Sequence, residues 1–488
     1  MPPSFHDILE EARLSARALW DFGDGLFNPT VRLGVTGLSR AGKTVFITAL
    51  IHGLTRGGRF PVFEAYAGGR IARARLEPQP DDAVPRFDYE NHVRTLIAER
   101  RWPSSTTDIS ELRLVIDYQR QNGAERSLTL DIVDYPGEWL LDLPLLNKSF
   151  EQWSAESLAL SREGPRKKLA APWHEYLATL WAEERADEQA ALTSARLFTD
   201  YLRACRDERF AMSLLPPGRF LMPGSLANSP ALTFAPLEVP AGGSAPDGSL
   251  WAMMVRRYEA YKDAVVRPFF RDHFARLDRQ IVLVDALAAF NSGPEALHDL
   301  EAALAGILDC FRIGRSTFFS SLFRPRIDRI LFAATKADHL HHSSHDRLEA
   351  ILRRIVARAA ERAEHEQAVI DVVALAAVRA TREAMVTRGR EKLPSILGTP
   401  AAGESANGEF FDGQTEVATF PGDLPADPEA LFKDNGFRGL SSTPSEKTDF
   451  RFLRFRPPHL EREGDAEPTL PHIRLDRALQ FLIGDRLQ

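Results

Sequence analysis

The sequence predicts an α/β fold in which a mostly parallel sheet is interrupted by a large helical insertion and followed by a turn-rich C-terminal extension. Three observations support this prediction. A glycine-rich loop lies between a short apolar strand, 30–36, and an apolar helix, 45–54. Strand and helix patterns alternate from 280 to 375, which is typical of a parallel sheet covered on both faces. Residues 145–277 show only helical periodicity and Pro/Gly-rich loops.

The composition is that of a folded protein of several domains, with 488 residues, 44% of them hydrophobic, and a net charge of -7. The acidic balance argues against non-specific binding of nucleic acid. Cys205 and Cys310 cannot form a disulfide framework, and no neighbouring ligands make them a zinc site. No apolar run is long enough to predict a transmembrane helix. We therefore expect a cytoplasmic protein, with peripheral attachment to the inner membrane as the alternative.

The first part of the sheet domain, 1–144, begins with an amphipathic helix, 5–22, which packs on the following domain or contacts a partner. The strand, glycine-rich loop and helix described above come next. After an irregular stretch we expect a short helix at 89–101. An Asn-Gly turn then joins two alternating strands, 112–118 and 128–133, which predicts a hairpin.

The insertion, 145–277, predicts a helical domain. The second part of the sheet domain, 278–384, resumes with strand patterns separated by helices. Its strands are predicted at 280–285, 329–334 and 369–375, and its helices at 294–313 and 346–363. The extension, 385–488, carries little periodic signal until an amphipathic helix at 472–487.

The glycine-rich loop, Gly37 to Thr44, matches G-x-x-x-x-G-K-[ST] at every fixed position, between the strand and helix that this pattern requires. Its glycines allow successive N–H groups to turn toward phosphate oxygens, and the helix N-terminus adds a positive dipole end. Lys43 would reach the β- and γ-phosphates, and the Thr44 hydroxyl would bind Mg²⁺. The expected nucleotide contacts are Ser39, Arg40, Ala41, Gly42, Lys43, Thr44 and Val45.

A D-x-x-G pattern, Asp134 to Gly137, follows the second hairpin strand. There the carboxylate would lie near Mg²⁺ and the glycine N–H near the γ-phosphate. The next residue is Glu138, where Ras-type enzymes use a glutamine to orient the attacking water. A carboxylate there can accept the proton of that water but also repels the phosphate, so we expect slow turnover. The predicted catalytic residues are Lys43, Asp134, Gly137 and Glu138.

The pattern [NT]-K-x-D occurs at Thr335 to Asp338, directly after a buried strand. The Asp338 carboxylate can accept hydrogen bonds from guanine N1–H and the 2-amino group, and adenine offers neither donor there. Such a match is worth about 2–5 kcal/mol, enough to favour GTP over ATP. We expect the Lys336 stem to pack along the base. Ala377 and Val378, after the next strand, would offer N–H groups to the 6-oxo group. A plain surface turn is the alternative.

A threonine before the hairpin should complete the Mg²⁺ site. The predicted metal ligands are Thr44, Asp134 and Thr107, with Thr106 as the alternative. Arg40 would either touch the nucleotide or pair with an acidic neighbour. An arginine of the insertion could also stabilise transition-state charge in cis. The candidates, all near its C-terminal end, are Arg256, Arg257, Arg267 and Arg271.

Several of these segments together resemble the YcjX family of bacterial proteins. They are Gly34–Thr44, Asp131–Leu140, Pro268–Asp285, Thr335–Asp338 and Ala376–Thr381. The resemblance implies a Ras-like GTP-binding domain interrupted by a helical domain. It also implies a stress-associated role linked to the phage-shock response and to envelope stress.

Together the motifs and the resemblance predict a Ras-like P-loop NTPase with GTP/GDP and Mg²⁺ as cofactors. The expected function is that of a molecular switch with slow GTP hydrolysis in a bacterial stress response. The alternative is a nucleotide-gated adaptor that binds GDP or GTP and hydrolyses little. ATP hydrolysis coupled to mechanical work is disfavoured by Thr335–Asp338. We expect a protein partner, in solution or at the membrane, and no nucleic acid.

Overall fold

The computed structural model describes residues 29–38, 40–227, 229–240, 242–310, 327–364, 368–388, 391–406, 408–432, 452–460 and 468–488. The predicted helix 5–22 and residue Ser39 lie outside these ranges.

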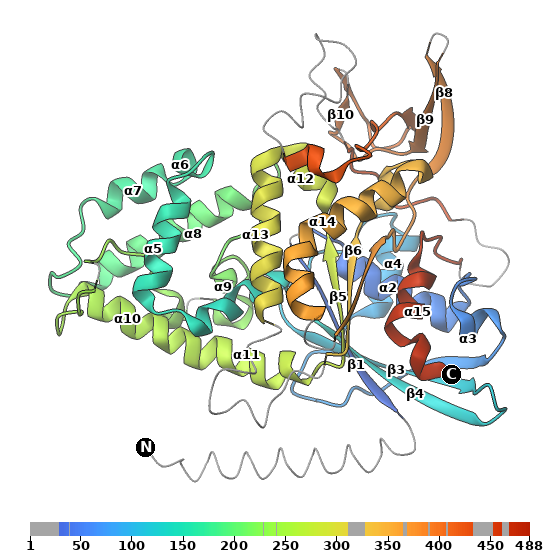
Figure 1. Cartoon of the computed structure of the whole chain (residues 1–488), viewed down its shortest axis with the longest axis horizontal. Coiled ribbons are helices and arrows are strands. Elements are labelled where there is room, and N and C mark those ends of the chain that lie inside the picture. The colour runs from blue at the N-terminus through green and yellow to red at the C-terminus, as the bar shows by residue number, and fades with distance from the viewer. Residues whose placement is uncertain are drawn as a thin grey trace.

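The centre of the molecule is a sheet that has seven strands within the described residues, in the order β2-β3-β4-β1-β5-β6-β7 (Figure 1). From β4 to β7 the neighbouring strands are parallel, whereas β3 pairs antiparallel with β4 and β2 antiparallel with β3. The strands are β1 (Thr30–Gly37), β2 (Ile71–Glu77), β3 (Ser110–Gln119), β4 (Glu125–Asp134), β5 (Arg279–Val284), β6 (Arg329–Ala334) and β7 (Val369–Ala374). The predicted α/β fold with a mostly parallel sheet is confirmed.

The parallel strands are apolar because both faces of the sheet are covered. In β5 every residue is buried, and successive side chains enter different cores: Ile281 packs in one cluster and Val282 in the other. Helices α2 (Lys43–Arg56), α4 (Tyr89–Ile97) and α15 (Leu475–Ile483) cover one face. Helices α12 (Ala286–Ser292), α13 (Pro294–Cys310) and α14 (His345–Glu364) cover the other. The C-terminal helix therefore belongs to the sheet domain, although the sequence grouped it with the extension.

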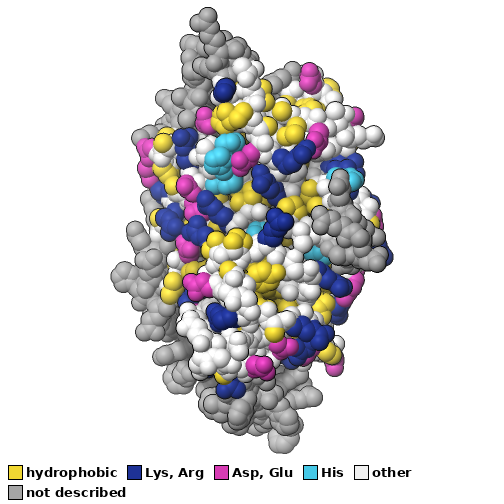
Figure 2. Space-filling view, turned by 90° about the vertical axis from the view of Figure 1, so that its right-hand side faces the viewer, with side chains coloured by type: hydrophobic (Ala, Val, Ile, Leu, Met, Phe, Trp, Pro, Cys, Tyr) yellow, Lys and Arg dark blue, Asp and Glu magenta, His cyan; other side chains and the backbone are white. Residues whose placement is uncertain are grey.

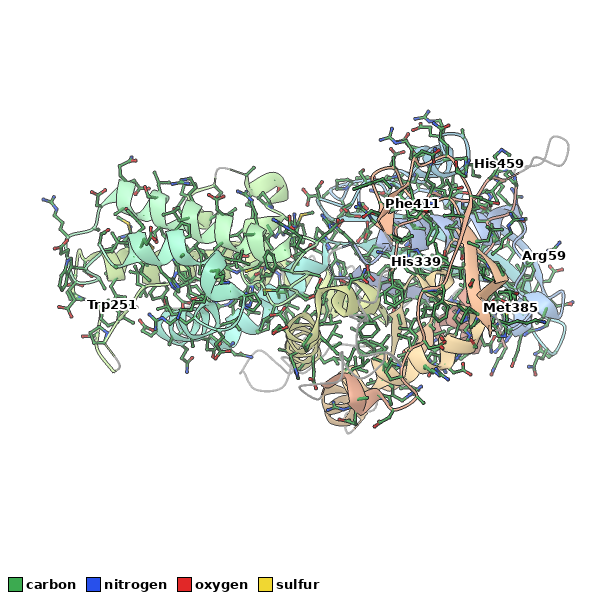
Figure 3. All side chains as sticks on the ribbon, turned by 90° about the horizontal axis from the view of Figure 1, so that it is seen from above. Arg59, Trp251, His339, Met385, Phe411 and His459 are labelled. Carbon is green, nitrogen blue, oxygen red and sulfur yellow. The ribbon has the colours of Figure 1, made fainter. Side chains whose placement is uncertain are left out.

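The insertion between β4 and β5 is helical. It forms the left half of Figure 1 and, seen from above in Figure 3, extends away from the sheet, with Trp251 in its outer part. Its helices are α5 (Phe150–Ser161), α6 (Arg166–Leu169), α7 (Ala171–Leu177), α8 (Glu188–Arg206), α9 (Gly218–Leu221), α10 (Leu250–Tyr261) and α11 (Arg267–Asp272). Buried rings fill its centre, where Trp153 contacts Phe198, Phe234 and Tyr258. This core is continuous with the one under α13 and α14.

The extension contains strands that the sequence did not indicate. A small antiparallel sheet joins β8 (Arg382–Arg388), β9 (Glu391–Gly398) and β12 (Val417–Thr419), and β10 (Ser405–Ala406) pairs with β11 (Glu409–Phe410). The helix between α2 and β2 is α3 (Glu64–Ala67). On the face shown in Figure 2, basic and acidic side chains are interspersed. Among the described helices, none combines the length and the apolar character needed to cross a bilayer.

Candidate nucleotide-binding site

A cavity of about 600 Å³ lies where the loops leave the carboxyl ends of β1, β5, β6 and β7. Ligands of open α/β sheets bind at this edge. The cavity brings together residues that the sequence placed in three separate motifs. Its lining includes Arg40, Ala41, Gly42, Lys43, Thr44, Val45, Lys336, Asp338, Ala377 and Val378.

The phosphate loop has the backbone that an anion site requires. Gly42, the residue before α2, has φ 84°, and no side chain caps the helix. The first N–H groups of α2 therefore remain available to a ligand at the cavity wall. Arg40 also has a positive φ, 62°. On the opposite side, a Cβ on Gly137 would lie 2.0 Å from the Gly37 carbonyl oxygen, so only glycine fits against the loop.

Three oxygen ligands converge beside Lys43. Thr106 Oγ1 donates to Asp134 Oδ2 at 2.6 Å and lies 3.3 Å from Thr44 Oγ1. The second Asp134 oxygen, Oδ1, is buried and has no hydrogen-bond partner among the described residues. Hydroxyl and carboxylate oxygens are hard ligands that suit Mg²⁺. The structure places Thr107, the ligand that the sequence favoured, differently: its side chain is exposed and bonds to none of these groups. Its neighbour Thr106 takes that place because the loop turns its hydroxyl inward.

The electrostatics of Asp134 also fit a cation. Burial raises the pKa of this carboxyl above its usual range, while the Lys43 ammonium and the Thr106 hydrogen bond act in the opposite direction. A buried carboxylate with an unpartnered oxygen is costly unless a positive charge compensates it. The Lys43 ammonium provides one such charge, and the hydroxyl and carboxylate oxygens fit a divalent cation as well.

The base-recognition motif is held from behind by the loop after β7. Asp338 is buried and its Oδ2 accepts the N–H of Ala380 at 2.8 Å, while the Thr381 hydroxyl donates to the Asp338 carbonyl oxygen. The N–H of Ala337 donates to Leu375 O at 3.1 Å. These bonds fix the Asp338 carboxylate at the cavity wall. The motif is therefore buried and held by tertiary hydrogen bonds.

The Lys336 side chain is also held in place. Its backbone has φ 60°, and its ammonium pairs with Asp285, which follows β5. Asp285 was not among the predicted residues, although its position at the end of a buried strand is a usable signal. The loop amides complete the base end: among the described residues, the N–H groups of Ala377 and Val378 donate to no protein acceptor, whereas Ala376 N–H donates to Ile473 O. Two N–H groups therefore remain for a ligand.

Glu138 contacts the helical insertion. Its side chain is buried and its Oε1 lies 3.6 Å from Arg206 Nη1, at the end of α8. Its carbonyl oxygen lies against Gly218, where a Cβ would approach to 1.8 Å. The insertion therefore touches both ends of the residue that follows the D-x-x-G motif.

Gly218 and Arg219 of the insertion also contact the residues that follow Glu138. Asp142 accepts the Gly218 N–H at 2.6 Å and the Tyr261 hydroxyl at 2.6 Å, and burial raises its pKa to about 6. The Arg219 guanidinium stacks over the Trp139 ring, 3.1 Å from its centroid. A movement of residues 138–142 would therefore move the insertion.

The four arginines proposed from sequence as cis contributors lie elsewhere. Arg257 pairs with Glu188, Arg267 with Asp263 and Arg271 with Asp272, and Arg256 is exposed. None of the four lines the cavity in the described part of the chain. Their positions fit the alternative that each is a solvated or packed helix residue, because closeness to the core in sequence does not bring them close to the phosphate loop in space.

Three parts of the chain meet at the cavity mouth in an ionic cluster. Glu208, after α8, pairs with Arg40 of the phosphate loop and with Arg454 of the extension, the latter at 2.9 Å. Arg454 also pairs with Glu404 at 2.6 Å. The Trp102 indole N–H donates to Phe455 O at 2.6 Å, which ties the extension to the loop before Thr106. The extension is thus part of the cavity wall.

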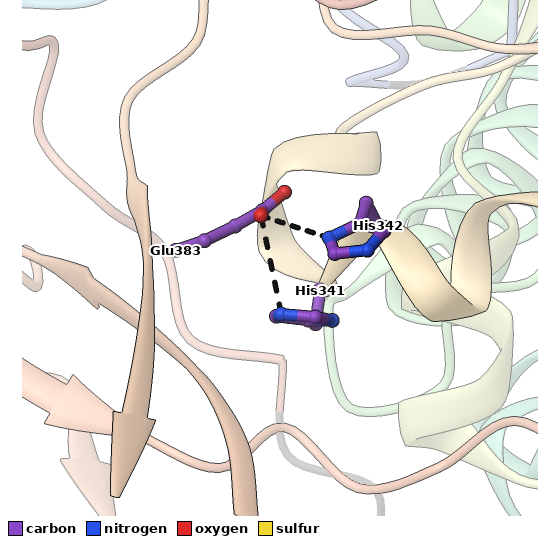
Figure 4. Close-up of side chains that lie close together, drawn as sticks. All are labelled: His341, His342 and Glu383. Atoms are coloured by element: carbon purple, nitrogen blue, oxygen red, sulfur yellow. Dashed lines mark hydrogen bonds and ion pairs between the residues drawn. The ribbon is translucent and has the colours of Figure 1, made fainter.

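A separate cluster of ligand-type side chains lies outside the cavity (Figure 4). His342 Nδ1 is 2.8 Å and His341 Nε2 is 3.9 Å from Glu383 Oε2. The three ligand atoms lie within 4.8 Å of one another. As they stand, these groups partner each other and join the loop after β6 to β8.

Known proteins resemble this chain over most of its length. A sequence model of the YcjX-like family, DUF463, matches residues 31–487. A protein of Escherichia coli strain K12 named Ras-like GTPase YcjX is 37% identical over 483 residues, which cover 94% of this chain and 96% of that protein. A protein of Shewanella oneidensis with the same name is 33% identical over 489 residues, which cover 94% of this chain and 95% of that protein.

Proposed function

The chain belongs to the YcjX-like family, and from this premise we propose that it binds a guanine nucleotide with Mg²⁺ and hydrolyses GTP slowly as a molecular switch. The observation that carries the proposal is the buried Asp338. Its carboxylate, held by the Ala380 N–H, lines the same cavity as the phosphate loop.

In this proposal the triphosphate lies on the N-terminus of α2, with Lys43 at the β- and γ-phosphates. The base lies at the other end of the cavity, along the Lys336 stem. Guanine N1–H and the 2-amino group donate to Asp338, and the 6-oxo group accepts from Ala377 or Val378. Adenine has an acceptor at N1 and no 2-amino group, so it would leave the buried carboxylate without donors.

Thr44, Thr106 and Asp134 are the residues that would hold Mg²⁺, directly or through water. The ion would neutralise charge on the β- and γ-phosphates. The residues themselves bind and orient: Thr106, whose hydroxyl already bonds to Asp134, would turn that hydroxyl to the metal when the triphosphate is bound. Two relatives that carry the name Ras-like GTPase support the guanine-nucleotide part of the proposal.

Switching would begin at Gly137, which packs against the first residue of the phosphate loop and whose N–H would donate to the γ-phosphate. Loss of that phosphate would release residues 138–142, which the insertion grips through Gly218 and Arg219. Slow hydrolysis follows from Glu138, since a carboxylate in place of a neutral water-orienting group repels the phosphate. A nucleotide-gated adaptor uses the same contacts without turnover. Measured turnover under excess GTP separates the two.

The stress-response role implied by the family resemblance, a protein partner and a cytoplasmic or membrane-peripheral location remain parts of this proposal. The stress role is what the family resemblance implies, whereas the expected location rests on the cysteine content and on the lack of a long apolar run in the sequence.

The proposal is tested by fluorescent-nucleotide titration of purified protein with GDP, GTP and ATP, each with Mg²⁺. Wild type should prefer guanine nucleotides by tenfold or more, about 1.4 kcal/mol. Asp338→Ala should lose that preference. The matched control is Asp346→Ala, because this carboxylate on α14 is 88% exposed and pairs only outside the cavity, with Arg474. Equal affinity for ATP in wild type, unchanged in Asp338→Ala, would refute the proposal.

A further inference from the structure

Beyond this function, we propose that Arg206, the last residue of α8, stabilises the transition state of GTP hydrolysis from within the same chain. The inference rests on the proposed GTP-binding function and names a residue that would accelerate GTP hydrolysis. It also assigns the helical insertion a part in catalysis.

The first argument is position. Arg206 lines the cavity beside the phosphate loop although it belongs to the insertion. Its Nη1 lies 3.6 Å from Glu138 Oε1. Glu138 follows Gly137, which packs on the first residue of the phosphate loop. Arg206 is therefore at the γ-phosphate end of the cavity, and among the described residues it is the single arginine of the insertion that lines this cavity.

The second argument is charge. The carboxylate of Glu138 would repel a γ-phosphate, and a guanidinium at this distance offsets that repulsion. Arg206 Nη1 also faces Met222 Sδ at 3.3 Å, which is a weak acceptor. A guanidinium has five N–H donors in a planar fork, so one amine can face Glu138 while another meets phosphate oxygens. The side chain is 30% exposed, so it can adjust when a nucleotide enters.

The third argument is preorganisation. The chain that carries Arg206 is fixed on both sides. Before it, Tyr201 of α8 accepts a hydrogen bond from the buried Arg166 at 3.0 Å. After it, Leu214 O accepts from Arg166 at 2.9 Å, and Glu208 pairs with Arg40 of the phosphate loop. Donors held in advance at the place where charge develops lower the barrier without reorganisation.

In the reaction, the water oxygen bonds to the γ-phosphorus. The bond from that phosphorus to the bridging oxygen breaks, and its electron pair stays on GDP. The protons of the water pass to the released phosphate and to solvent. Negative charge spreads over the γ-oxygens and the bridging oxygen, and the Arg206 guanidinium would compensate it there.

The experiment compares wild type with Arg206→Ala, Arg206→Lys and a control, Arg203→Ala. Arg203 lies one turn earlier on α8, is 57% exposed and pairs with Asp200 away from the cavity. Three quantities are measured for each: GDP affinity, single-turnover GTP hydrolysis, and capture of aluminium fluoride by the Mg²⁺·GDP complex. The third reports transition-state binding without any turnover.

We expect Arg206→Ala to bind GDP within about twofold of wild type, to capture no aluminium fluoride, and to lose hydrolysis by roughly 10³-fold. Arg206→Lys keeps the charge but not the fork, so it should bind GDP normally and recover only part of both losses. Arg203→Ala should match wild type.

Three outcomes would overturn the inference. One is hydrolysis and aluminium fluoride capture in Arg206→Ala equal to wild type. Another is a fall in GDP affinity as large as the fall in hydrolysis, in both Arg206 variants, which marks a structural role. The third is full recovery by lysine. If wild type itself fails to bind guanine nucleotides, the proposed function fails and the result is distinguishable from these.

Discussion

Thr106 donates its hydroxyl hydrogen to the Asp134 carboxylate at 2.6 Å, across the gap between a surface loop and the end of β4. The same hydroxyl oxygen lies 3.3 Å from the Thr44 hydroxyl at the start of α2. Three elements that are distant in sequence therefore present oxygen ligands to one point beside the phosphate loop. The proposed Mg²⁺ would bind at this point. Through it, the position of the loop before β3 would depend on which nucleotide is bound.

Replacing Thr106 by Ala should weaken binding of Mg²⁺·GTP by about tenfold, the value of one lost metal or charged hydrogen-bond contact. GDP affinity should change little, because the Thr106 hydroxyl is expected to leave Asp134 for the metal only when the triphosphate is bound. Calorimetric titration with a non-hydrolysable GTP analogue and with GDP measures both. Thr107→Ala is the matched control, since its side chain is exposed. Equal effects of the two substitutions would contradict the assigned ligand.

Acidification should weaken Mg²⁺·GTP binding at a higher pH than for an ordinary aspartate, whose pKa is about 3.9. Because burial raises the pKa of Asp134, its carboxylate becomes protonated at a higher pH than an ordinary aspartate does. A protonated carboxyl does not bind the metal. The folding stability of the ligand-free protein depends on pH in the opposite direction. Because the raised pKa means that ionising Asp134 is costly in the folded state, this residue lowers the free energy of unfolding as pH rises above about 3.9. Magnesium titrations of wild type and of Asp134→Asn across the acid range measure the effect as the difference between the two proteins, because the nucleotide phosphate titrates equally in both. An equal pH dependence in the two proteins would contradict it.

Removing the Asp299 carboxylate should destabilise the protein strongly. This residue on α13 pairs with the buried Arg166 and accepts the Leu214 N–H at 2.8 Å. Asp299→Ala leaves a buried guanidinium without its counter-ion, which typically costs about 3–5 kcal/mol. Urea denaturation measures the loss. In the control Asp200→Ala, which removes an exposed ion-pair partner on α8, the change should stay within about 0.5 kcal/mol. Similar values for both would refute the role assigned to the buried pair.

Glu208→Gln should speed GDP release by roughly two- to fivefold, because exposed ion pairs contribute up to about 1 kcal/mol each. The substitution frees Arg40 and removes one of the two partners of Arg454, and both arginines lie at the cavity mouth. The effect should shrink at high salt, since solvent screens such pairs. Stopped-flow displacement of a fluorescent GDP gives the rate. A release rate that is unchanged even at low salt would show that the cluster does not gate the nucleotide.

The sequence revealed those parts of the fold whose pattern is dictated by burial. Strands β5 and β6 can be recognised as apolar runs because both of their faces are covered. The phosphate loop can be recognised because its glycines and Lys43 are the residue types that phosphate binding requires. Strand β2 was not recognised because none of its residues is fully buried and two of them are exposed. Strand β9 was missed because Pro394 and polar residues interrupt any alternation.

A site residue could be predicted from the sequence where a local motif contains it. It could not be predicted where only tertiary contacts bring the residue to the site. Asp338 and Asp134 follow buried strands and could be placed from the sequence. The choice between Thr106 and Thr107 depends on which way one loop residue turns. Arg206 became evident only when the folded insertion brought it to Glu138, because an arginine at the end of a surface helix has no distinguishing pattern.

The most direct test of guanine recognition is to measure the affinities of wild type and Asp338→Asn for GDP and for xanthosine diphosphate. In xanthine an oxo group replaces the 2-amino group. The asparagine amide can donate to that oxo group while its carbonyl still accepts from N1–H, so the hydrogen-bond pattern is inverted at one atom. We predict that wild type prefers GDP by at least tenfold and that Asp338→Asn prefers the xanthine nucleotide. The same order of preference in both proteins would contradict the assignment of Asp338 to the base and, with it, the central claim.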